Sequence, residues 1–164
     1  MLFFWILVIY LFVVWFLLRL TVPHLGFSKV AVPDSIPSEL NSKITEYNQI
    51  SKTDNEFLRN CYGYVTTKYK GSRIKTITEF WSAFGDTLNK SEGFLPCTNQ
   101  NYLLRVMLIK SGRFTEEDIQ VIVVPLNFFI HQYLRVKADG NWIDVDPWSN
   151  FLNVSFGKKL SYFG

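Results

Sequence analysis

The chain of 164 residues has only two cysteines, Cys61 and Cys97, and only two histidines. Two cysteines are too few for a disulfide scaffold, and the absence of a CxxC pair with so few histidines argues against a zinc site. The chain also lacks a large excess of either charge, because 17 Lys and Arg stand against 14 Asp and Glu and the formal net charge is +3. Basic runs interleaved with aromatic residues are absent, so the sequence does not support nucleic-acid binding. We therefore expect neither a metal or organic cofactor nor a nucleic-acid partner.

Hydrophobic residues, by contrast, make up 48% of the chain and aromatic residues 17%. This content is enough for the core of one domain in a chain of this length. The longest apolar run is MLFFWILVIYLFVVWFLL, residues 1–18, and Arg19 ends it. A helix needs about 20 apolar residues to cross a bilayer, with ~17 at the short end. We therefore interpret residues 1–20 as a single-pass membrane anchor in contact with the lipid bilayer.

A cleaved signal peptide is the alternative interpretation of this run. Signal peptides have an apolar core of roughly 7 to 15 residues, with basic residues before it and a small-residue cleavage site after it. Here no Lys or Arg precedes the run, and RLTVPHLGF follows it, so the uncleaved anchor is preferred. Arg19 and Lys29 lie on the C-terminal side, and the positive-inside rule then favours the cytoplasmic side for the following domain.

The rest of the chain divides into a linker and one domain. Residues 21–45 contain several prolines and predict a juxtamembrane linker, and residues 46–164 predict the folded domain. Within the domain, helical spacing of apolar residues predicts three helices. They cover residues 53–71, 77–88 and 98–110.

The sequence period changes after the third predicted helix. Three segments rich in β-branched or alternating residues are predicted to be strands. They cover residues 119–126, 129–137 and 142–146. Asp139-Gly140 between the last two is a strong signal for a two-residue hairpin turn. Helices followed by an antiparallel sheet predict an α+β domain.

Cys97, His131 and Asp146 are the candidate catalytic residues. Cys97 lies at the start of the third predicted helix, where unpaired backbone N–H groups and the helix dipole favour a thiolate. His131 and Asp146 lie on the two strands joined by the predicted turn. A thiol, an imidazole and a carboxylate that meet in space can activate the thiol, accept its proton and orient the ring.

The hairpin register decides which aspartate reaches His131. A two-residue turn at Asp139-Gly140 places Asp146 opposite Tyr133, so that Asp146 is a diagonal neighbour of His131 within reach of the ring. In the same register Asp144 faces Arg135. Asp144 is therefore predicted to be a cross-strand charge partner, and Asp146 the partner of His131.

In these pieces the chain resembles the transglutaminase-like superfamily of papain-related folds. They are Cys97 with the helix NQNYLLRVMLIKSG, His131-Gln132-Tyr133, and the segment WIDVDP at residues 142–147. The resemblance implies helices packed on an antiparallel sheet, with Cys97 as nucleophile, His131 as general base and acid, and Asp146 as the residue that orients the imidazole. It also implies a peptide or protein substrate, attacked at an amide or acyl bond through a thioester. Peptidase, deamidase and acyl-transferase chemistry all fit this scheme.

The chain differs from the family pattern beside the cysteine. Many members have glycine two residues before it and tryptophan just after it, where this chain has Leu95 and Thr98. These differences bear on the oxyanion hole, for which the backbone N–H of Cys97 is one expected donor. Trp81 and Gln100 are the candidates for the second.

Two alternatives to an active enzyme follow from the same residues. In the first, the domain has the transglutaminase-like fold without activity and serves as a membrane-tethered module that binds a protein or peptide. In the second, a disulfide between Cys61 and Cys97 makes the sulfur of Cys97 structural. For Cys61 itself, a buried apolar position is the preferred interpretation.

Overall fold

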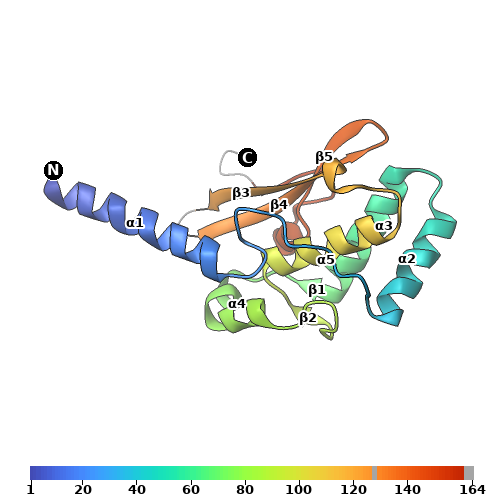
Figure 1. Cartoon of the computed structure of the whole chain (residues 1–164), viewed down its shortest axis with the longest axis horizontal. Coiled ribbons are helices and arrows are strands. Elements are labelled where there is room, and N and C mark those ends of the chain that lie inside the picture. Colours follow the sequence, from blue (N-terminus) through green and yellow to red (C-terminus); the bar gives the residue numbers. More distant parts are fainter. Residues whose placement is uncertain (127–128, 161–164) are drawn as a thin grey trace.

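The computed structural model describes residues 1–126 and 129–160 (Figure 1). Its main sheet has three antiparallel strands in the order β3-β4-β5, and a short parallel pair, β1 and β2, lies apart from it. The α-helices are α1 (Leu2–Thr21), α2 (Ser38–Ile50), α3 (Asp54–Lys68), α4 (Arg73–Thr78) and α5 (Cys97–Lys110). The strands are β1 (Tyr69–Lys70), β2 (Gly93–Phe94), β3 (Ile119–Leu126), β4 (Phe129–Ala138) and β5 (Asn141–Val145). Short 3-10 turns are η1 (Phe80–Phe84), η2 (Glu116–Asp118) and η3 (Trp148–Leu152). The predicted α+β class is confirmed.

Helix α1 extends away from the other elements, with the N-terminus at its far end (Figure 1). Residues Phe3–Thr21 have a mean hydropathy of 2.5, and none of this stretch is buried. By length and composition the helix is able to cross a membrane. Its last residues lie at the end of the molecule where α4 and the start of β4 are also found (Figure 1).

The core lies between α5, α3 and the sheet. α5 is buried along most of its length because apolar side chains point both toward α3 and toward β4. Cys61 is fully buried on α3 among these apolar residues. The main members of the core are Phe57, Leu58, Val65, Leu103, Leu104, Met107, Leu134 and Val136.

The hairpin register follows the prediction. Ala138 pairs with Asn141, and the pairing continues to Leu134 and Val145. Asp139 and Gly140 both have positive φ, 49° and 80°, which is the conformation of the tight turn that Asp-Gly favours. The strand β5 therefore ends one residue before Asp146.

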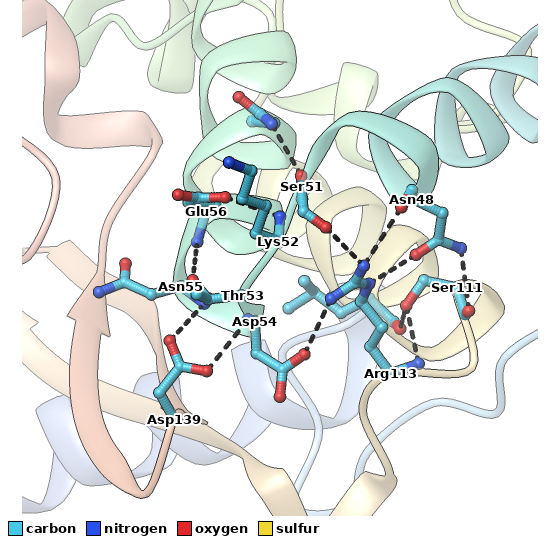
Figure 2. A network of polar contacts seen from close by, with 12 residues as sticks. Asn48, Ser51, Lys52, Thr53, Asp54, Asn55, Glu56, Ser111, Arg113 and Asp139 are labelled. Atoms are coloured by element: carbon cyan, nitrogen blue, oxygen red, sulfur yellow. Dashed lines mark hydrogen bonds and ion pairs between the residues drawn. The ribbon is translucent and has the colours of Figure 1, made fainter.

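The same turn is attached to helix α3 (Figure 2). The two carboxylate oxygens of Asp139 accept hydrogen bonds from the backbone N–H groups of Asp54 and Asn55, at 3.1 Å each. Thr53 caps the helix by accepting from the N–H of Glu56. These bonds satisfy first-turn donors of α3 and hold the hairpin against the helix layer.

The prediction of one helix over residues 77–88 is wrong. The chain forms α4 and then η1, and it turns at Gly85. The Asp86 carboxylate then accepts from the N–H groups of Leu88 and Asn89, at 3.0 and 3.2 Å. Such a side-chain turn competes with helical bonding, which explains the break.

Two other boundaries differ from the prediction. Helix α2 was not predicted, and it begins inside the predicted linker 21–45 and crosses the predicted boundary at residue 45. It forms because Leu40 and Ile44, spaced by one turn, bury their side chains in the core. The helix predicted over 53–71 ends at Lys68, since the next two residues form β1.

Candidate functional site

His131 and Asp146 form a buried pair. The Nε2 atom of His131 lies 2.7 Å from Oδ2 of Asp146. Both residues are almost fully buried. The register explains the contact. The pairing of β4 with β5 ends at Leu134 and Val145, His131 lies on β4 just past this last pair, and Asp146 directly follows β5. With Nε2 bound to the carboxylate, Nδ1 is the ring nitrogen left for another partner.

Asp146 is held by more than His131. Its Oδ1 accepts from the backbone N–H of Ser149 at 3.2 Å, and its Oδ2 also accepts from the N–H of Leu160 at 3.1 Å. The Ser149 hydroxyl donates to the Asp146 carbonyl at 3.0 Å. A carboxylate with donors on both oxygens has one orientation, so it presents a stable acceptor to His131.

Cys97 is the first residue of α5, directly after Pro96. Its surface is 9% exposed, so a small part of the residue can be reached from outside. Both cysteines are free thiols, and the disulfide alternative does not describe this structure. Burial raises the pKa of the Cys61 thiol well above its usual range, which makes Cys61 inert and agrees with the structural role predicted for it.

The His131 pKa reflects both of its partners. Burial by itself lowers the pKa of this imidazole, but the bond to Asp146 and polar interactions with the Cys97 thiol outweigh it. Together they raise the His131 pKa from 6.5 to about 10. The protonated ring is therefore favoured, and that is the form produced when an imidazole takes the proton of a thiol.

Trp148 covers the histidine. Its ring centroid lies 5.2 Å from that of His131, and Phe151 packs edge-on against Trp148 at 4.9 Å. η3, which carries both aromatic residues, therefore shields the His131–Asp146 bond from water. The hairpin register that places Asp146 opposite Tyr133 also places Trp148 opposite His131, and from the sequence alone Trp148 is interpreted only as a packing residue.

Of the two proposed second oxyanion donors, Gln100 is partly engaged elsewhere and Trp81 is largely exposed. The side-chain amide of Gln100 donates to the Leu95 carbonyl at 2.9 Å and so braces the segment before Cys97. Trp81 lies on η1 with its side chain 61% exposed. Thus Gln100 shapes the approach to α5, and the second donor stays unassigned.

A cavity of about 410 Å³ adjoins Cys97. Its wall comes from the end of α1, from α4 and η1, and from the start of α5, and it was not foreseen from the sequence. Buried polar contacts hold this wall together: the Asn99 side-chain amide donates to the Ala83 carbonyl at 3.2 Å and to the Thr87 hydroxyl at 2.7 Å.

No family model, curated protein or solved structure matches the chain. Within residues 1–126 and 129–160, no group of three or more His, Cys, Asp or Glu side chains is arranged to hold a metal ion.

Proposed function

We propose that the protein is a membrane-anchored cysteine enzyme of the transglutaminase-like class, with Cys97, His131 and Asp146 as its catalytic triad. The observation that carries the proposal is the buried His131–Asp146 bond of 2.7 Å beside a thiol that raises the His131 pKa. A buried histidine bound to a well-held carboxylate and next to a helix-start cysteine is the arrangement that thiol activation requires.

In the proposed reaction, His131 takes the Cys97 proton on Nδ1 while Asp146 holds Nε2. The thiolate sulfur attacks the carbonyl carbon of an amide or ester, and a C–S bond forms. The C–N or C–O bond then breaks, and the leaving group takes the proton from His131. Water or an amine attacks the thioester, the C–S bond breaks, and the proton returns to the sulfur by way of His131.

The backbone N–H of Cys97 is the proposed first donor to the developing oxyanion, because it belongs to the unpaired first turn of α5. One N–H of the Gln100 side-chain amide is used in the hydrogen bond to the Leu95 carbonyl, and this favours one alternative function. In that alternative, the domain has this fold without activity and binds a peptide or protein beside the membrane. The two functions differ in whether Cys97 turns over an acyl substrate.

The first test is the pH dependence of Cys97 alkylation by iodoacetamide in the full chain, followed by mass spectrometry of the Cys97 peptide. We expect wild type to react at pH values well below the ~8.5 of a free thiol. In His131→Gln and Asp146→Asn the reactive range should move up toward ~8.5. Cys61→Ser is the matched control and should retain the wild-type profile. Equal profiles in wild type and His131→Gln would contradict the proposal.

A second measurement separates the enzyme from the binding module. Release of p-nitrophenolate from p-nitrophenyl acetate, together with a transient acetyl adduct on Cys97, is expected for wild type. Cys97→Ser should show only background hydrolysis. A thiol that alkylates in a His131-dependent way but never carries an acetyl group would favour the module.

A further inference from the structure

The cavity beside Cys97 has an apolar wall. Among its lining residues in the described chain none is charged, and Thr76, Cys97 and Thr98 are the polar or sulfur-containing ones. The other lining residues are Leu18, Val22, Leu25, Ile77, Phe80, Ala83, Phe84, Pro96 and Ile130. A volume of about 410 Å³ lies within the range of cavities that bind small ligands. A wall of this kind selects hydrocarbon, because a polar or charged peptide group placed there loses its hydrogen bonds to water.

The cavity also lies at the end of the membrane helix. Leu18 and Val22, from the last turn of α1 and the residue after it, form part of its wall. A helix that spans a bilayer brings its last turn to the bilayer surface. The cavity mouth is therefore placed where acyl chains and headgroups meet.

The surface around this mouth is apolar as well. Five large apolar side chains on α4 and η1 are between 54% and 74% exposed. They are Ile74, Ile77, Phe80, Trp81 and Phe84. A soluble domain rarely exposes so many large apolar residues in one short segment, and a tryptophan among them is typical of the membrane interface. The segment α4–η1 thus continues the lipid-contacting surface of α1 up to the thiol.

We propose that this cavity binds the fatty-acyl chain of a membrane amphiphile and presents its carbonyl carbon to Cys97. The inference rests on the proposed function and names its substrate class: a long-chain acyl ester or amide that reaches the thiol from the bilayer. Attack by sulfur forms an acyl thioester and breaks the C–O or C–N bond to the headgroup, which leaves with the proton from His131. Water then cleaves the C–S bond and releases the fatty acid.

The test compares two alkylating acids that differ only in chain length, 2-bromobutanoate and 2-bromohexadecanoate. With each, the Cys97 sulfur displaces bromide, and the rate is followed by mass spectrometry of the full chain in phospholipid nanodiscs. We expect each methylene that the cavity holds to raise the rate about fourfold. The long-chain reagent should therefore exceed the short one by well over tenfold in wild type.

Ala83→Phe is the variant that fills the cavity, because the small Ala83 side chain forms part of its wall. Ala31→Phe is the matched control, since Ala31 is exposed and outside the wall. The long-to-short ratio should fall by at least about tenfold in Ala83→Phe and stay at the wild-type value in Ala31→Phe. Both variants carry the same anchor as wild type, so partition of the reagent into the bilayer affects all three proteins equally and cancels when their long-to-short ratios are compared.

Protection of the wild-type protein gives a second measurement that does not depend on folding of a variant. Hexadecanoate is expected to slow iodoacetamide alkylation of Cys97, and butanoate at equal concentration is not. The inference is overturned if the long-to-short ratio is equal in wild type and a folded Ala83→Phe, or if hexadecanoate gives no protection. If Cys97 reacts with 2-bromobutanoate no faster than it does in His131→Gln, the proposed function itself fails.

Discussion

Protonation and folding are coupled at His131. The folded pKa is raised from 6.5 to about 10, so the imidazolium stabilises the folded state fully below about pH 6.5. This stabilisation is lost as the pH rises from about 6.5 to about 10. We expect the free energy of unfolding, measured by urea titration, to fall across this range more steeply in wild type than in His131→Gln.

His24 provides the control for this prediction. Burial, with the nearby Arg105 charge, lowers the pKa of His24 to about 4. Its effect on stability therefore lies between about pH 6.5 and 4, where stability falls as the pH falls. His24→Asn, which tolerates the positive φ of 62°, should follow wild type from pH 6.5 to 10. Parallel profiles for wild type and His131→Gln in that range would show that His131 is not coupled to folding.

Individual residues of the site were predictable where the cause is local. The turn at Asp139-Gly140 sets the register of the hairpin. This register brings Asp146 to His131, and it brings Asp144 to Arg135, whose Nε donates to Oδ1 of Asp144 at 2.7 Å. The hydrogen bond from the Gln100 side-chain amide to the Leu95 carbonyl was not predictable. It depends on how the segment before α5 packs, which no sequence spacing reports.

At the scale of elements, Gly71 joins β1 to the region around the site. A Cβ atom at this position would lie 2.2 Å from the Trp148 carbonyl oxygen and 2.6 Å from Cδ1 of Phe151. Gly71→Ala must therefore displace η3, and we expect it to lower the free energy of unfolding by about 1–3 kcal/mol. Because Trp148 covers His131, the reactive pH range of Cys97 should change as well.

Gly63→Ala is the matched control for this substitution. Gly63 lies within α3, and an added Cβ would meet nothing within 4 Å. Alanine is favoured over glycine inside a helix by about 0.5–1 kcal/mol, so this variant should be at least as stable as wild type. Urea midpoints of both variants and wild type, measured at one pH, test the two expectations. A Gly71→Ala midpoint equal to that of wild type would show that η3 is displaced without loss of stability.

Elements whose ends carry local signals were predicted well, and those set by distant contacts were not. Thr53 caps α3 within three residues of itself, and the alternation of β4 is visible in the sequence. The path of α4 and η1 depends instead on Asn99, whose side chain reaches back to Ala83 and Thr87. Such bonds join residues that are 12 and 16 positions apart in the sequence, so the local helical spacing over 77–88 was misleading.

For the whole molecule, the segment after α1 is attached rather than free. The His24 ring stacks on Tyr102 with centroids 4.0 Å apart. Arg105 donates to the Val30 carbonyl, and Lys110 donates to the Asp34 carbonyl at 3.0 Å. These contacts follow α5 along its length, so the predicted linker holds the anchor and the domain in one orientation. With α1 anchored as proposed, that orientation determines which face meets the bilayer.

The prediction at this scale concerns which tryptophans contact lipid. Trp81 lies on η1, which contributes Phe80, Ala83 and Phe84 to the cavity wall, and Trp142 lies on β5. Figure 1 shows the hairpin of β4 and β5 turning away from the end of α1 and from α4. With the full chain in nanodiscs that contain brominated phospholipid, Trp81 fluorescence should be quenched and Trp142 fluorescence should not. Trp81→Phe should then lower the quenched fraction of the total emission, and Trp142→Phe should raise it, because each removes one component. The same change in both variants would mean that α4–η1 does not reach the bilayer, and an acyl chain would then have no direct path from the lipid to Cys97.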